Sequence, residues 1–185
     1  YTLEFVAASD VYKRQLVYTL NSEGYASQCV YSLSSQNRIY QFSYSAEGYL
    51  TGIVENIDDT EYSSTSLTYE NGDITSISSK MNGLENKFIY EPGEESSTYH
   101  LPCLGLLEIH PLTFHIEALY AGLLGKDPRH FTMHSCPAGS NDEKTVYSYG
   151  FDKKGNPSRM ICQTTYAGGQ ASYYPYTRNI SISFE

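Results

Sequence analysis

Tyr44-Ser45-Ala46-Glu47-Gly48-Tyr49-Leu50 decides the fold of this chain, because an aromatic strand runs here into a short polar turn that contains glycine. The glycine suits the left-handed backbone position that follows a type I turn in a β-hairpin. Before the turn, aromatic and polar residues alternate over residues 40–44, which is the period of a strand with one buried face. The stretch therefore predicts two antiparallel strands and the turn between them.

The same pattern occurs five times along the chain. Leu20-Asn21-Ser22-Glu23-Gly24-Tyr25 is an earlier copy, and Tyr69-Glu70-Asn71-Gly72-Asp73-Ile74 is a later copy with a two-residue type I′ turn. Degenerate copies begin at Tyr90 and Tyr149. Strands joined in series by short hairpins form an antiparallel meander, and about ten such strands curl or expose apolar surface. The sequence therefore predicts a mainly β protein whose repeated hairpins form a curved or partly closed, barrel-like sheet.

Ten strands are expected, at residues 16–20, 25–33, 38–45, 49–56, 65–70, 73–79, 86–90, 144–151, 158–166 and 180–184. After two of the turns, the apolar pairs Leu50/Ile53 and Ile74/Ile77 are three residues apart. A regular strand would send the two members of such a pair to opposite faces. We therefore expect either that both faces are partly covered or that a β-bulge re-phases the strand, with Gly52 as a candidate.

Residues 99–140 interrupt the repeat with one short helix. Apolar residues from Ile116 to Leu124 have helical spacing, Thr113 can cap the helix, and Gly125 can end it ahead of Pro128. We expect this helix to cover an open face or mouth of the curved sheet. Residues 16–185 are accordingly expected to form a single β domain with a helical insert at about 99–140.

The start of the chain is different in kind. Ser9-Asp10-Val11-Tyr12-Lys13-Arg14-Gln15 resembles a translated adapter string that recurs at the ends of metagenomic sequences. Residues 1–15 are therefore treated as a doubtful N-terminal segment, a sequence artefact, and they carry no functional weight.

Three features together resemble a known family: the Tyr-x-Tyr hairpins with glycine, Ala121-Gly122-Leu123-Leu124-Gly125-Lys126, and Tyr147-Ser148-Tyr149 followed by Phe151-Asp152 and Gly155. That family comprises secreted lipoproteins of unknown function from Gram-negative gut bacteria, with a fold described as porin-like. The resemblance implies export to the periplasm, outer-membrane surface or exterior, a lipid anchor absent from this chain, and no catalytic residue. The hairpins alone also resemble tyrosine-aspartate (YD/RHS-type) repeats, although only Phe151-Asp152 carries the aspartate.

Composition limits the partners. The net charge is −9 and the basic residues are scattered, which excludes nucleic acid as a partner. No apolar run is long enough for a transmembrane helix, so membrane contact is expected only through the lipid anchor. Three disulfide pairings are conceivable, and buried free thiols are the alternative. The four cysteines are Cys29, Cys103, Cys136 and Cys162.

Metal binding is a candidate chemistry because His130 and His134, four residues apart, would share one face of a helix with Cys136 close by. Pro128 and Pro137 leave little room for such a helix, so we expect histidines that lie on the surface or pack in the insert, no metal and no cofactor. Carboxylate pairs occur at Asp58-Asp59 and Glu94-Glu95 in polar loops. A glycosidase needs one of its carboxyls desolvated in a cleft, and acids in loops are usually solvated.

Tyrosine is used 19 times and tryptophan never. Most strand tyrosines are expected to be cross-strand pairs, but Tyr173, Tyr174 and Tyr176 cluster in a loop where exposed rings can stack on sugars. The predicted function is a non-enzymatic, exported envelope or cell-surface β domain that acts as a scaffold or a binding module, with a glycan or an envelope protein as partner. The alternatives are a glycan hydrolase that uses Asp58 and Glu94, and a barrel-like carrier of a small apolar ligand.

Overall fold

The structure, a computed structural model, describes residues 2–7, 14–33, 36–96, 109–140, 143–154, 157–166 and 176–181. Its strands form one sheet of 12 antiparallel strands, in which each strand lies beside its neighbours in sequence. The strands are β1 (Thr2–Ala7), β2 (Arg14–Leu20), β3 (Ala26–Leu33), β4 (Gln36–Tyr44), β5 (Leu50–Ile57), β6 (Thr60–Glu70), β7 (Asp73–Met81), β8 (Leu84–Ser96), β9 (His130–Pro137), β10 (Glu143–Phe151), β11 (Pro157–Tyr166) and β12 (Tyr176–Ser181). A 3₁₀ turn, η2 (Leu112–Phe114), and a short helix, α1 (Ile116–Tyr120), complete the described elements.

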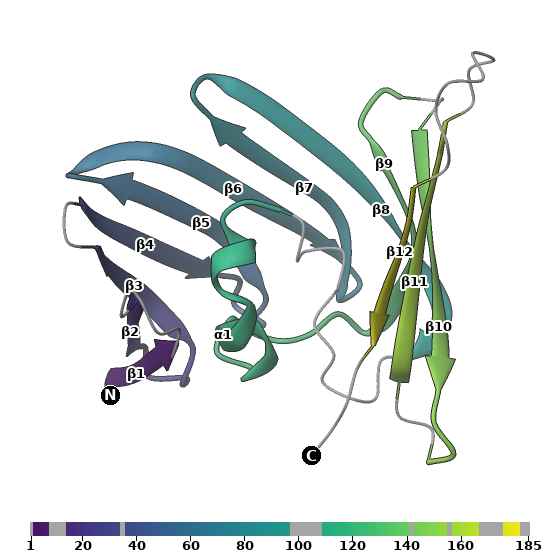
Figure 1. Ribbon diagram of the computed structural model, residues 1–185, viewed down its shortest axis with the longest axis horizontal. Coiled ribbons are helices and arrows are strands. Elements are labelled where there is room, and N and C mark those ends of the chain that lie inside the picture. The colour runs from purple at the N-terminus through teal and green to yellow at the C-terminus, as the bar shows by residue number, and fades with distance from the viewer. Residues whose placement is uncertain are drawn as a thin grey trace.

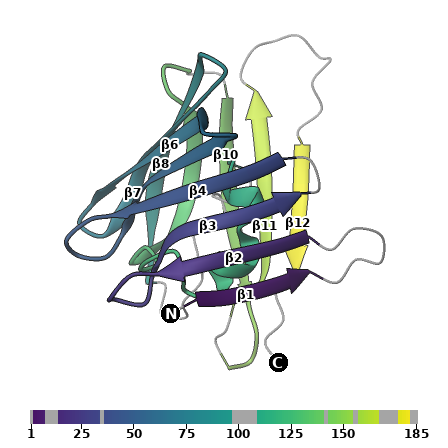
Figure 2. The ribbon, with the colours of Figure 1, turned by 90° about the vertical axis from the view of Figure 1, so that its left-hand side faces the viewer.

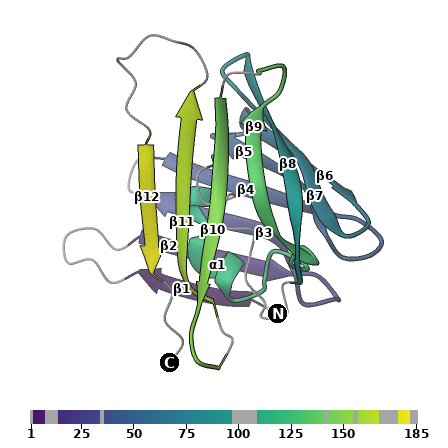
Figure 3. The same ribbon diagram turned by 90° about the vertical axis from the view of Figure 1, so that its right-hand side faces the viewer.

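The sheet bends into two arms. Figure 1 shows an N-terminal arm, β1–β7, facing a C-terminal arm, β9–β12, with the long strand β8 leading from one to the other and α1 between them. From the side, the strands of the two arms cross steeply, and α1 again lies between the arms (Figures 2 and 3). Because β1 and β12 are the two ends of the strand order, the sheet is open. The predicted curved antiparallel meander with one short helix is confirmed.

The first two turns have the same hydrogen bonds, as their sequences predict. Asn21 N donates to Tyr25 O and Ser45 N donates to Tyr49 O, at 2.7 and 2.8 Å. The Asn21 and Ser45 side-chain oxygens each accept two backbone N–H groups inside their own turn. Gly24 and Gly48 have φ of 87° and 91°, the left-handed conformation expected after a type I turn. Asn71-Gly72 has φ of 53° and 89°, as a type I′ turn requires.

A β-bulge follows each of these turns. Opposite β4, the register passes from Gly52 to Leu50 and skips Thr51, and opposite β6 it passes from Ser76 to Ile74. The bulge lets Leu50 and Ile53 both face the core, where they are 2% and 0% exposed. The predicted re-phasing near Gly52 is therefore confirmed. Gly24, Gly48 and Gly72 recur every 24 residues, so the hairpins form a regular structural repeat.

Each of the ten expected strands overlaps an observed strand, with ends that differ by up to six residues and with residues 182–184 of the last one outside the described residues, and two further strands were missed. One is β1, which pairs with β2 from Thr2↔Thr19 to Ala7↔Arg14 and lies inside the doubtful segment 1–15. Whether residues 1–15 belong to the natural protein stays untested. The other is β9, which pairs with β8 and β10. The placement of Glu94-Glu95 in a loop was wrong, since β8 extends to Ser96.

The inserted helix is shorter than predicted. Thr113 lies within η2, and the residue before α1 is His115, which makes no side-chain cap. The helix also ends early, because Gly122 takes φ of 70° and donates its N–H to Leu119 O while Leu123 N donates to Ala118 O. This pair of bonds is a Schellman motif, so Gly122 and not Gly125 ends the helix.

The insert packs on the N-terminal arm. Leu112, His115 and Ala118 are 0% exposed and Leu119 is 7% exposed. They complete a core made by the inward-facing residues of β2–β8. The helix therefore covers one face of the curved sheet, as expected, and brings the segment that follows it to the hairpin turns.

Candidate binding site

A cleft opens between two adjacent hairpin turns. The ladder between β5 and β6 ends at Gly52↔Ser66, so the β4–β5 and β6–β7 turns extend beyond it as separate fingers. The space between them, which we call the hairpin-tip cleft, has a volume of about 700 Å³. It is lined by Ser45, Glu47, Tyr49, Thr51, Leu67, Thr68, Tyr69, Asn71, Gly72, Lys126 and Arg129.

Two tyrosine rings stack in the cleft. The ring centroids of Tyr49 and Tyr69 are 4.9 Å apart with an interplanar angle of 29°. The preceding pair of hairpins carries the equivalent stack, Tyr25 on Tyr44, at 5.2 Å and the same angle. Tyr49 and Tyr69 are only partly buried, so the hairpin-tip cleft presents aromatic surface on a backbone that the repeat holds in place.

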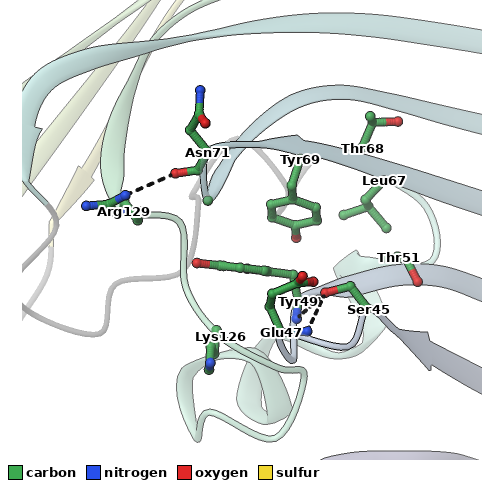
Figure 4. Close-up of a pocket in the computed structure, with 11 residues that line it drawn as sticks. Ser45, Glu47, Tyr49, Thr51, Leu67, Thr68, Tyr69, Asn71, Lys126 and Arg129 are labelled. Carbon is green, nitrogen blue, oxygen red and sulfur yellow. Dashed lines mark hydrogen bonds between the residues drawn. The ribbon is translucent and has the colours of Figure 1, made fainter.

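The segment 123–130 crosses the three hairpins whose turns contain Gly24, Gly48 and Gly72. Ala26 N donates to Leu123 O at 2.7 Å, Lys126 N donates to Gly48 O at 2.9 Å, and Arg129 N donates to Gly72 O at 3.1 Å. The contacts advance three residues along the segment for every 24-residue repeat of the sheet. This register sets Lys126 and Arg129 at the side of the cleft away from Thr51 and Thr68 (Figure 4).

Glycine is required where this segment meets the turns. A Cβ atom on Gly125 would lie 2.7 Å from Gly48 O, and one on Gly72 would lie 2.5 Å from Arg129 Cδ and 2.8 Å from Tyr49 Oη. The aliphatic part of Arg129 therefore lies directly over Gly72. Its guanidinium donates to Asn71 O at 3.4 Å (Figure 4), and the side chain is exposed.

Among the described residues that line the cleft, Glu47 is the one acidic side chain. Glu47 is exposed, and a hydrogen bond from Ser45, together with the charge of Lys126, lowers the pKa of Glu47. Hydroxyl and amide groups come from Ser45, Thr51, Thr68 and Asn71. This lining offers one carboxyl, whereas a glycosidase uses a pair.

The predicted tyrosine site is not tested by the structure. Tyr173 and Tyr174 lie outside the described residues. Tyr176 begins β12 opposite Thr164.

The hairpin-tip cleft was missed because its two tyrosines come from different hairpins, although the recurrence of Tyr25 and Tyr49 after the turn glycine was a usable signal.

The candidate histidine group is not brought together. His130 and His134 lie on β9, a strand along which four residues span about 13 Å, so they do not share the face of a helix. His130 Nδ1 bonds Asp73 Oδ2 at 2.8 Å, whereas His134 Nδ1 bonds Glu91 Oε2 at 3.2 Å. Cys136 lies farther along β9, opposite Ile89. Within the described ranges, no group of three or more His, Cys, Asp or Glu could hold a metal ion.

The carboxylates considered for hydrolysis are solvated. Asp58 and Asp59 have φ of 47° and 64° and form the exposed two-residue turn between β5 and β6. Glu94 is exposed on β8. The two acids named for the hydrolase alternative are therefore exposed to solvent, whereas a glycosidase needs one of its carboxyls desolvated in a cleft.

Sequence reasoning also missed a buried carboxylate. Glu55 is 0% exposed and accepts hydrogen bonds from Arg38, Tyr40, Ser63 and His110 at 2.5–3.2 Å. Burial alone would raise the pKa of Glu55, but the hydrogen bonds from His110 and Ser63 and the charge of His110 hold it below 4.5. The period-2 pattern of β5 was a signal, because Glu55 follows Ile53 on the inner face. The cluster joins the insert to the sheet.

A neutral histidine lies in the core beside this cluster. His115 Nδ1 is 2.7 Å from the hydroxyl of Tyr18, and the rings of Tyr40 and Phe42 meet the imidazole edge-to-face at 4.4 and 5.3 Å. Burial lowers the pKa of His115 to about 3.

The thiol of Cys29 is free and buried. None of the three four-cysteine disulfide pairings is therefore present, since each requires Cys29.

The comparisons with known proteins agree with this fold. A family model described as a domain of unknown function (DUF4595) with porin-like fold matches residues 2–159. The chain belongs to this family. A crystal structure of a porin-like protein from Bacteroides uniformis ATCC 8492 is similar, with 26% identity and a TM-score of 0.83 over 98% of this chain and 76% of that chain. The resemblance to a family with a porin-like fold is confirmed. No curated protein matches. None of the described helices is long and apolar enough to cross a membrane.

Proposed function

We propose that this chain is a non-enzymatic binding module of the bacterial cell envelope that holds a glycan in the hairpin-tip cleft. The observation that carries this proposal is the stacked pair Tyr49/Tyr69, partly buried in a cleft of about 700 Å³ that also offers hydroxyl and amide groups. Aromatic faces pack on the C–H faces of sugar rings, and polar groups around them pair with sugar hydroxyls.

The envelope location is supported by the family. The similar solved protein is called porin-like and comes from Bacteroides uniformis, and the resemblance to secreted lipoproteins implies export and a lipid anchor. A module held at the cell surface by its anchor would present the open turns of its sheet to glycans outside the cell. A role as scaffold for an envelope protein is compatible with the same location.

Affinity electrophoresis tests the glycan proposal. The chain is run through gels cast with host and plant polysaccharides beside Tyr49→Ala, in which the stack is lost, and Tyr49→Phe, in which the ring remains. We expect at least one polysaccharide to retard the wild type and Tyr49→Phe but not Tyr49→Ala. Tyr120→Ala removes a tyrosine that is 42% exposed on α1 and serves as the matched control.

The Tyr174→Ala/Tyr176→Ala variant is the fifth sample in the gels. It tests the tyrosine cluster that the sequence favours as the binding site. Retardation that is lost in this variant and kept in Tyr49→Ala would contradict the hairpin-tip cleft as the site. A wild type that no polysaccharide retards would contradict the glycan-binding function itself.

A further inference from the structure

Two basic side chains, Lys126 and Arg129, line the hairpin-tip cleft. Neither forms an ion pair with another described residue. The ion pairs recorded among the described residues involve neither Lys126 nor Arg129, and the guanidinium of Arg129 makes one hydrogen bond, to a backbone carbonyl. Both side chains are exposed at the cleft. The lining of the cleft therefore carries two cations and one acid, in a chain with a net charge of −9.

The fold sets the positions of these cations. Lys126 N and Arg129 N donate to Gly48 O and Gly72 O, so each cationic residue is fixed to the tip of a different finger. The aliphatic stem of Arg129 lies directly over Gly72. A side chain at residue 72 would therefore collide with Arg129 Cδ. Holding the stem reduces the conformational entropy that the guanidinium loses when a ligand binds.

We infer that the ligand of the hairpin-tip cleft is an acidic saccharide, one that carries a carboxylate or a sulfate on the sugar ring. This inference rests on the proposed glycan binding. The sugar ring lies against Tyr49, and its anionic group lies between the Lys126 ammonium and the Arg129 guanidinium. Guanidinium binds carboxylate or sulfate oxygens through two parallel N–H donors, and the ammonium adds a third charge-assisted hydrogen bond.

Glu47 adds orientation to the site. Its carboxylate lines the same cleft and is stabilised in the charged form by Ser45 and Lys126. An anionic group of the ligand is repelled from Glu47, whereas neutral sugar hydroxyls can donate to it. The acidic group of the saccharide is therefore directed away from Glu47 and into the space between Lys126 and Arg129.

Isothermal titration calorimetry separates the sources of the anion. The wild type is titrated with tetragalacturonic acid, with its methyl ester, with a sulfated galactose tetrasaccharide and with the unsulfated form of that tetrasaccharide. We expect one acidic member to bind at least tenfold more tightly than its neutral counterpart, and added salt to weaken that binding. The acid that binds identifies carboxylate or sulfate as the group recognised.

The variant Lys126→Gln/Arg129→Gln tests the two cations, and its backbone keeps both N–H donors. We expect it to bind the acidic ligand roughly 10- to 100-fold more weakly and the neutral counterpart unchanged. Lys80→Gln/Lys87→Gln makes the same charge change on exposed residues of the β7–β8 hairpin and should leave all affinities unchanged.

Two outcomes overturn the inference in distinguishable ways. Equal affinity for acidic and neutral members, unchanged in Lys126→Gln/Arg129→Gln but lost in Tyr49→Ala, would leave glycan binding intact and refute recognition of the anion. A wild type that binds none of the four saccharides, while a neutral polysaccharide retards it in gels, would refute the acidic class alone. No binding of any saccharide in either experiment would refute the proposed function as well.

Discussion

At the scale of single residues, the core of this β protein buries polar groups as well as apolar ones. Glu55 is fully buried and its oxygens accept from four side chains. A buried carboxylate is tolerated when its hydrogen bonds are satisfied, and removing one partner costs far more than the pair contributes. His115 is equally buried, but it lowers its cost by staying neutral.

His115 predicts a pH dependence of stability. The unfolded chain binds a proton at His115 below about pH 6.5, whereas the folded chain does not until about pH 3, so acid favours unfolding across this window. The contribution of His115 is fully present above pH 6.5 and is lost as the pH falls. We expect the free energy of unfolding to fall between pH 6 and 4 with a slope about 1.4 kcal/mol per pH unit steeper than in His115→Gln.

Urea denaturation at several pH values measures this slope. The wild type and His115→Gln are measured in the same buffers at each pH. The same slope in His115→Gln as in the wild type would show that His115 is protonated in the folded protein.

At the scale of elements, the hairpins follow from their own sequences and the segment 123–130 does not. Each turn is set by local chemistry, such as Asn21 or Ser45 closing its turn and a glycine supplying positive φ. β9 was missed because its pairing with β8 and β10 depends on the long strand β8, not on local alternation. The early end of α1, by contrast, is local, because Gly122 supplies the positive φ of its Schellman motif.

The close contact of Gly125 with the second hairpin predicts how sensitive the docking of segment 123–130 is to a larger side chain. Gly125→Ala places a Cβ atom 2.7 Å from Gly48 O, a backbone atom that cannot move without disturbing the second hairpin. Gly24→Ala is the matched control, since Gly24 has φ of 87° against 92° at Gly125 and open space around it. Both variants pay about 1–2 kcal/mol for a left-handed alanine. We expect Gly125→Ala to lose about 1–3 kcal/mol more in urea denaturation, as overpacking does. Equal losses would show that the segment adapts without cost.

At the scale of the whole molecule, a 24-residue repeat produces the hairpins of the N-terminal arm and the hairpin-tip cleft between two of their turns. The sequence predicted the meander, the curvature and the inserted helix, because those depend on patterns within each repeat. It did not predict the hairpin-tip cleft, since Tyr49, Tyr69, Lys126 and Arg129 meet only when the insert crosses the hairpins. The same crossing explains why the histidines, which are concentrated near the insert, have separate partners on β5, β7 and β8.

Amide hydrogen exchange with and without tetragalacturonic acid tests the central claim, that a glycan binds in the hairpin-tip cleft. We predict slower exchange, on adding the saccharide, in three segments that line the cleft: 44–51, 67–73 and 123–130. The strands β10 and β11 should exchange at the same rate in both samples. Protection confined to the C-terminal arm, or no change at saccharide concentrations that saturate binding in calorimetry, would contradict the account.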